Sequence, residues 1–121
     1  MLDRTATHAK IASGASLSGE VDLRGKILVA IQAPAAWTAA DLSFQAAEKP
    51  TAEGGVYGEV FEGDAVGGGA ALVVDAAASQ YTLLNFEGKP QNCMLKVRSG
   101  TSGVPVLQGA DRDIILYVQP F

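Results

Sequence analysis

Apolar and polar side chains alternate along most of the 121-residue chain, in short segments that Gly, Pro and Asp separate. A period of two is the period of a β-strand, and no helical period persists. The clearest segment is residues 26–32 (KILVAIQ), which Pro34 ends because proline cannot donate to a sheet ladder. Both alternating sets are apolar: Ile27, Val29 and Ile31 on one face, Leu28 and Ala30 on the other. The pattern predicts a central strand that is covered on both faces.

Further strand patterns occupy residues 9–12, 16–23, 42–45, 56–61, 71–75, 80–85, 93–98 and 112–119. Short strands separated by glycine turns are typical of sandwiches and jelly rolls. We therefore predict an all-β fold, a single jelly-roll-like β-sandwich domain of eight or nine short strands over residues 13–121. Residues 1–12 are polar and are predicted to form a flexible N-terminal arm. In the last strand, Ile114, Leu116 and Val118 are expected to share one face.

Charge and composition exclude several classes of protein. The net charge is −4, with 9 basic and 13 acidic residues, and the acidic residues concentrate in residues 41–90, which we interpret as solvated loops. The basic residues form no cluster, so nucleic-acid binding is not expected. The N-terminus lacks a signal-peptide pattern and no apolar run is long enough to cross a bilayer. We expect synthesis in the cytoplasm without an export signal, and no membrane partner.

The residues that catalysis requires are scarce. The one histidine, His8, lies near the terminus and is expected to be an exposed residue of the arm. The one cysteine, Cys93, sits in a strand pattern and is expected to act as a small buried hydrophobic residue. Triads need a histidine beside a nucleophile, and zinc needs three or four ligands. The sequence therefore predicts a protein that is not an enzyme and that holds no cofactor or metal.

The one tryptophan, Trp37, lies where the chain turns between two predicted strands. A tryptophan in such a place either plugs the end of a sandwich or stacks on a sugar ring. We favour the plug, because alanines and Thr38 flank Trp37 and no residue beside it suits sugar hydroxyls. If the chain contacts a partner or a glycan, the candidate residues are Trp37, Tyr57, Arg98, Thr101 and Ser102.

Two blocks of sequence carry a resemblance to a known group of proteins. The first runs from Lys26-Ile-Leu-Val-Ala-Ile-Gln through Pro-Ala-Ala-Trp-Thr-Ala-Ala-Asp-Leu-Ser-Phe-Gln-Ala. The second contains Leu95-Lys-Val-Arg-Ser-Gly-Thr-Ser, Pro105-Val and Ala110-Asp-Arg, followed by the last apolar strand. Together, over residues 13–47 and 93–120, the chain resembles small structural proteins of tailed bacteriophages and gene transfer agents. Those proteins have a discoidin-like Ser-x-Asp-Gly turn between the blocks, which residues 48–57 alter.

The resemblance implies a virion component attached to the head, either a decoration protein or the base of a vertex spike or fibre. The expected partners are the major capsid protein or a neighbouring fibre or spike subunit. Assembly as a homo-oligomer on the particle is also expected. The alternative is a carbohydrate-binding adhesin module that recognises host surface glycans through Trp37, with Tyr57 and residues 98–103 as helpers.

Overall fold

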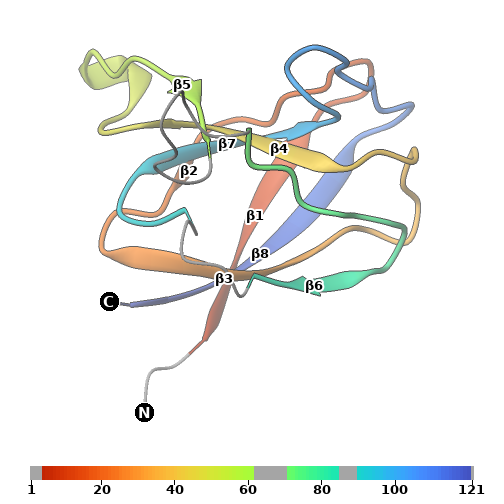
Figure 1. Ribbon diagram of the computed structural model, residues 1–121, viewed down its shortest axis with the longest axis horizontal. Helices are drawn as coiled ribbons and strands as arrows, with labels where there is room; N and C mark the ends of the chain where they lie inside the picture. The colour runs from red at the N-terminus through yellow and green to blue at the C-terminus, as the bar shows by residue number, and fades with distance from the viewer. Residues whose placement is uncertain (1–3, 62–70, 85–89, 121) are drawn as a thin grey trace.

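The computed structural model describes residues 4–61, 71–84 and 90–120, and it is built almost entirely from β-strands (Figure 1). In chain order the elements are β1 (Thr5–Ile11), β2 (Val21–Asp22), β3 (Lys26–Gln32), β4 (Leu42–Ala47), the 3₁₀ turn η1 (Thr51–Glu53), β5 (Gly58–Glu59), β6 (Tyr81–Leu83), β7 (Met94–Ser99) and β8 (Arg112–Pro120). These elements confirm the predicted all-β sandwich, with eight strands in the described ranges.

The strands form two four-stranded antiparallel sheets that lie one above the other in Figure 1. Sheet A has the order β1-β8-β3-β6 and sheet B the order β2-β7-β4-β5. Strand β1 pairs with β8, β2 with β7, β3 with β6 and β4 with β5. The first strand thus pairs with the last, and the second strand pairs with the next to last. This pairing arises when one long hairpin is rolled up, and it is the topology of a jelly roll.

One hydrophobic core joins the two sheets. Fully buried side chains reach it from the central strands of both sheets: Leu28 and Ile31, Leu42 and Phe44, Leu95 and Val97, and Ile114, Leu116 and Val118. The shared face predicted for the last strand is confirmed. The protein thus hides the apolar face of each sheet against the other, which is the main driving force for this architecture.

Strand β3 has the predicted bounds and the predicted central place, but not the predicted faces. Its register with β8 shifts between Leu28 and Ala30, so one residue bulges out of the ladder. Leu28 and Ile31 consequently point into the core together, although they are three residues apart. A bulge moves every later side chain to the opposite face, so simple alternation of Ile27, Val29 and Ile31 is wrong here.

The prediction of a flexible arm is wrong for residues 5–11. Strand β1 pairs with β8 along its full length, from Thr5 opposite Val118 to Ile11 opposite Arg112. Ala9 and Ile11 are 1% and 0% exposed and belong to the core. Alternation explains the error, because the polar residues of this segment face outward while a smaller apolar set faces inward. Residues 1–3 of the expected arm lie outside the described residues.

Several predicted strands are much shorter in the structure. Residues 16–23 contribute only the two-residue β2 and an isolated bridge at Leu17, and residues 56–61 contribute only the two-residue β5 and an isolated bridge at Phe61. Residues 71–75 make isolated bridges to Phe61 and Leu42 instead of a strand. The outer strands β2, β5 and β6 are therefore all short, whereas the central strands have six residues or more.

Candidate functional site

The five candidate site residues fall in two separate places. Trp37, Thr101 and Ser102 lie at the end of the sandwich formed by residues 12–16, 33–41 and 100–111, which we call the loop end. Tyr57 and Arg98 lie on the outer face of sheet B. Trp37 and Tyr57 lie near opposite ends of strand β4. Trp37 comes shortly before Leu42, the first residue of β4, whereas Tyr57 comes just before Gly58, which pairs with Ala46 near the other end. The residues of the glycan alternative therefore do not form one stacking site.

Trp37 has the geometry of a plug. It is partly buried and packs against the hydrophobic core. Its indole Nε1 donates a hydrogen bond to the carbonyl oxygen of Ala40 at 3.2 Å, which closes the turn from β3 into β4. Tryptophan N–H groups normally find such a partner when the ring is buried. The ring therefore covers the core between the sheets where the chain changes sheet.

A buried glutamine that sequence patterns did not single out holds the loop end together. Gln108 is 1% exposed, and its side chain accepts a hydrogen bond from the backbone N–H of Thr38 at 3.0 Å and donates one to the Thr38 carbonyl at 3.1 Å. Its Oε1 also accepts from Arg112 Nε at 3.2 Å. Its backbone bonds to Gly14 and Ala15. One residue thus connects three chain segments through its side chain and its backbone, and no local pattern around residue 108 marks this role.

Residues 100–107 form a tight hairpin next to these hydrogen bonds of Gln108. The N–H of Gly100 donates to Asp41 O at 2.7 Å, and Thr101 and Val104 close the tip. The N–H of Val106 and the hydroxyl of Ser99 complete its base. Gly100 has φ +89°, and a Cβ there would lie 2.4 Å from the Val104 carbonyl oxygen. Only glycine fits this position, because it has no Cβ and tolerates a positive φ.

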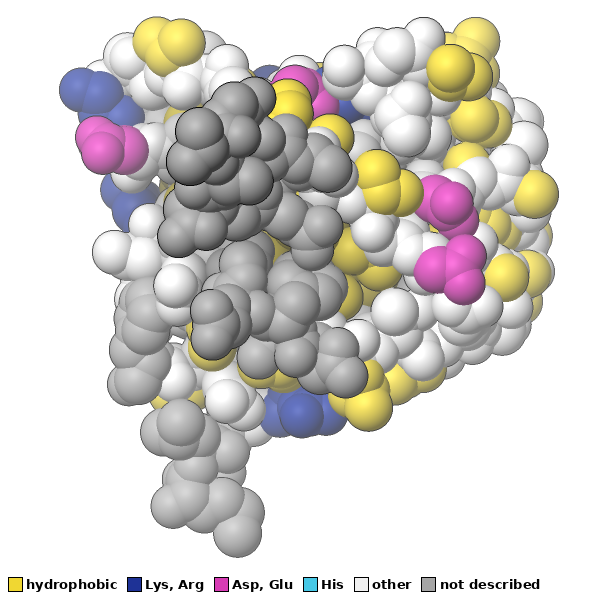
Figure 2. All heavy atoms as spheres, viewed as in Figure 1, with side chains coloured by type: hydrophobic (Ala, Val, Ile, Leu, Met, Phe, Trp, Pro, Cys, Tyr) yellow, Lys and Arg dark blue, Asp and Glu magenta, His cyan; other side chains and the backbone are white. Residues whose placement is uncertain are grey.

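This fixed hairpin exposes apolar side chains. Val104 is 70% and Leu107 is 63% exposed, among the most exposed large hydrophobic residues of the described chain. In Figure 2 hydrophobic side chains reach the surface at the upper right, over the loop end. The predicted contact residues Thr101 and Ser102 belong to the same hairpin, where Thr101 Oγ1 accepts a hydrogen bond from Val104 N. A rigid loop that presents apolar side chains is suited to docking, because little order is lost on binding.

Arg98 belongs to a polar cluster on the outer face of sheet B. Its side chain is 9% exposed and forms two hydrogen bonds of 2.6 Å with the two carboxylate oxygens of Glu59. The same guanidinium donates to Ser43 Oγ at 3.2 Å, and Gln45 Nε2 donates to Glu59 at 3.0 Å. These bonds lower the pKa of Glu59, with Arg98 the largest cause. Arg98 is thus paired within the protein and is not free for a ligand.

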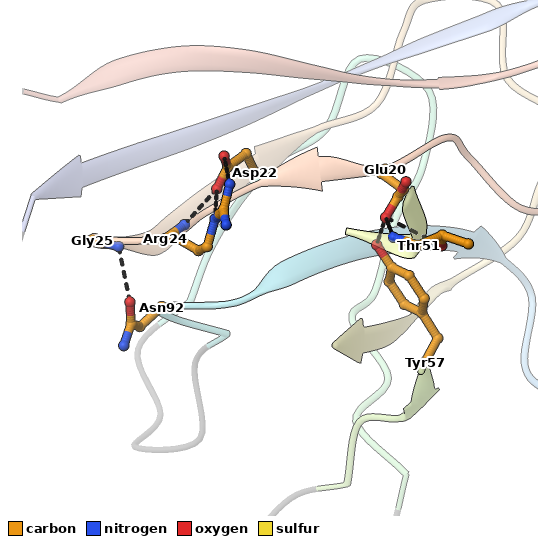
Figure 3. A network of polar contacts seen from close by, with 7 residues as sticks. All are labelled: Glu20, Asp22, Arg24, Gly25, Thr51, Tyr57 and Asn92. Atoms are coloured by element: carbon orange, nitrogen blue, oxygen red, sulfur yellow. Dashed lines mark hydrogen bonds and ion pairs between the residues drawn. The ribbon is translucent and has the colours of Figure 1, made fainter. Parts of the chain in front are cut away.

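Tyr57 sits in a second cluster on the same face, around Glu20 (Figure 3). Glu20 Oε2 accepts hydrogen bonds from the Tyr57 hydroxyl at 2.5 Å and from Thr51 N at 3.0 Å. Both lower the pKa of Glu20, while burial and the bond to Glu20 raise that of Tyr57. Lys96 Nζ lies 4.4 Å from the centre of the Tyr57 ring. The cluster ties the β4–β5 connection to β2, and one face of the Tyr57 ring is already occupied.

Beside this cluster, Figure 3 shows the turn between β2 and β3, at residues 22–25. The Asp22 carboxylate accepts hydrogen bonds from the side chain and backbone N–H of Arg24, which lowers the pKa of Asp22 to about 2. Gly25, with φ +77°, donates its N–H to Asn92 Oδ1 at 3.0 Å. These contacts stabilise the reversal of the chain: the Asp22–Arg24 pair closes the turn, and Gly25 adopts the left-handed conformation that the turn requires.

His8 and Cys93 are the two other residues that the sequence analysis considered for chemistry. His8 lies on β1 and pairs with Asp113 at 2.9 Å, with both side chains more than half exposed. The Cys93 thiol is partly buried, which raises its pKa. Within residues 4–61, 71–84 and 90–120, no group of three or more His, Cys, Asp or Glu side chains is placed to hold a metal ion. In the same ranges, no helix is long and apolar enough to span a membrane.

Comparisons with protein-family models, with curated proteins and with solved structures give no match to this chain.

Proposed function

We propose that the chain is a non-enzymatic structural protein of a virion, from a tailed phage or a gene transfer agent. It attaches to the head as a decoration protein or as the base of a vertex spike or fibre. Its partner is the major capsid protein or a neighbouring spike or fibre subunit. The observation that carries this proposal is the rigid hairpin at residues 100–107, which holds Val104 and Leu107 in solvent.

The energetics of the hairpin favour docking. Large apolar side chains exposed side by side mark interaction surfaces more often than isolated ones do. Burying a Val or Leu side chain contributes about 1.5–3 kcal/mol when it is fully removed from water. Because hydrogen bonds at Gly100, Thr101 and Val106 already hold the loop, a partner need not order the backbone.

The fold also brings together the two sequence blocks that resemble phage structural proteins. Residues 33–41, from the first block, and residues 100–111, from the second, meet at the loop end through Gln108 and Gly100. Segments about seventy positions apart in sequence thus form one surface. If both blocks contribute to one docking surface, this accounts for why they resemble phage structural proteins while residues 48–57, between them, differ from those proteins.

The proposal is tested by measuring how much of the protein is present on particles. We expect particles purified from a producing host to contain the protein at a fixed copy number. The double variant Val104→Asp/Leu107→Asp should reduce that copy number at least about tenfold, since two charges replace the apolar contacts. Val56→Asp is the matched control, because Val56 is 86% exposed on a different loop. Particles that lack the wild-type protein, or that retain the double variant fully, would overturn the proposal.

A further inference from the structure

Strand β6 is an edge strand without charged protection. Its side chains Tyr81 and Leu83 are 42% and 60% exposed, and no residue of the segment Gln80-Tyr-Thr-Leu-Leu84 carries a charge. The other edge strands each carry an ionisable residue: Lys10 and His8 in β1, Asp22 in β2 and Glu59 in β5. Because charges on edges oppose pairing with other chains, β6 is the edge best suited to accept another strand.

The direction of its backbone groups shows what β6 offers. Gln80 O accepts from Ala33 N at 3.2 Å, and Leu84 N donates to Val29 O at 3.0 Å, so the even-numbered residues face β3. In an antiparallel ladder alternate residues point to opposite sides. The N–H and C=O groups of Tyr81 and Leu83 therefore point away from β3. Among the described residues, β3 is the only strand paired with β6.

We infer that β6 pairs antiparallel with β6 of a second copy, around a two-fold axis at Thr82. This register places Tyr81 opposite Leu83 of the other copy, and Leu83 opposite its Tyr81. The outward-pointing groups of these residues then form four main-chain hydrogen bonds, and the two Thr82 residues form a pair without hydrogen bonds. The two sheets A join into one continuous sheet, as in other strand additions.

Self-complementarity identifies the occupant as a second copy. A two-fold contact requires that residue i meets j and that j meets i. The segment Tyr-Thr-Leu satisfies this with an aromatic–aliphatic pair formed twice and a Thr–Thr pair, both of which are favourable across strands. The exposed apolar side chains of both edges are covered at once. A foreign strand needs a matching sequence of its own to do the same.

Tyr81 is already held in place for such a contact. Its ring centre lies 5.0 Å from that of Tyr117, and its hydroxyl accepts a hydrogen bond from Arg4 Nη1 at 2.8 Å. On the core side, Thr82 Oγ1 donates to the Asp75 carbonyl at 3.1 Å, which ties β6 to the segment that precedes it. A fixed aromatic anchor loses little freedom on binding. Because the pairing involves three residues per copy, we expect a weak dimer that a particle surface strengthens by raising local concentration.

Sedimentation velocity over a wide concentration range, up to millimolar protein, tests this register. We expect a reversible dimer whose dissociation constant rises about tenfold in Tyr81→Glu and in Leu83→Lys. An equimolar mixture of these two variants should associate more tightly than either variant alone, because Glu at position 81 then faces Lys at position 83. Val56→Lys, on an exposed loop, is the control and should dimerise like the wild type.

Each outcome decides the question. A monomer at every concentration, dimers that ignore both substitutions, or a mixture that associates no better than its components would each overturn the β6 pairing. Thermal unfolding of each variant checks that the substitution leaves the fold intact. We expect melting temperatures close to that of the wild type, because both substituted side chains are exposed. The experiment uses no particle, so its failure is distinct from a failure of the virion assignment.

Discussion

The pair formed by Arg98 and Glu59 allows a quantitative test of how sheet B is held together. Arg98→Ala removes two hydrogen bonds of 2.6 Å to Glu59 and one of 3.2 Å to Ser43. Breaking a buried ion pair by removing one partner costs about 3–5 kcal/mol. Because the Glu59 side chain is 25% exposed, water compensates part of this loss. We expect the free energy of unfolding to fall by about 3 kcal/mol, near the lower end of that range.

Urea unfolding followed by Trp37 fluorescence measures this change as a shift in midpoint at constant slope. Arg24→Ala is the control, since the side chains of the Arg24–Asp22 pair are 43% and 53% exposed and solvent screens their interaction, so this substitution should cost much less than Arg98→Ala. The double variant Arg98→Met/Glu59→Leu should be more stable than Arg98→Ala, because no charge is left unpaired. The reasoning is refuted if Arg98→Ala costs no more than Arg24→Ala, or if the double variant is the least stable.

Four further predictions follow from the fold. Ile11→Ala should lower the free energy of unfolding by about 2–5 kcal/mol, because Ile11 is fully buried; a change below 1 kcal/mol in urea unfolding would mean that β1 is dispensable. Trp37 should emit at shorter wavelength than free tryptophan, with quenching by acrylamide that added oligosaccharides leave unchanged; protection by sugar would support the glycan alternative instead. Because the pKa of Glu59 is lower in the folded protein than its ordinary value of 4.5, its ion pair stabilises the fold at pH above 4.5, and this stabilisation is lost as the pH falls through the folded pKa. The free energy of unfolding of Glu59→Gln should therefore depend less on pH in acid than that of the wild type, and an equal pH dependence would contradict this. Gly100→Ala should lower the free energy of unfolding by about 2 kcal/mol, while Gly103→Ala should lower it far less, because a Cβ at position 103 meets open space. Equal losses of stability in thermal unfolding would show that position 100 does not require glycine.

The central strands were predictable because their apolar alternation is long. Strand β3 begins and ends where expected, and β4, β7 and β8 lie within one or two residues of the predicted ranges. Their side chains face a core on at least one side, which leaves a clear trace in the sequence. The short edge strands β2, β5 and β6 were overestimated, because the length of an edge depends on how far the neighbouring strand extends.

Strand β1 and the bulge in β3 show where pattern alone fails. In β1 only Ala9 and Ile11 are core residues, and two apolar positions among polar ones look like an arm. The register shift between Leu28 and Ala30 leaves no signal when every residue around it is apolar. Both features depend on β8, which is about one hundred positions away from β1.

The candidate site was predictable only in part, because its contacts are long-range. The sequence indicates Arg98 as a candidate contact residue, yet Glu59 pairs with it from the edge strand β5, which lies beyond β4 in sheet B. The structural role of Gln108 depends on Thr38, seventy positions away. The sequence indicates Thr101 and Ser102 as candidate contact residues, and the structure adds that they belong to a hydrogen-bonded hairpin beside the exposed Val104 and Leu107. No single residue of that hairpin predicts its rigidity.

The most direct test of the docking proposal is photocrosslinking from the hairpin on assembled particles. A photoreactive amino acid is placed at position 107 in one preparation and at position 56, which is even more exposed, in another. We predict that position 107 crosslinks to the capsid protein or to a spike or fibre subunit, while position 56 does not. Crosslinks to particle proteins from position 56 alone, or none from position 107 on particles that carry the protein, would contradict the account.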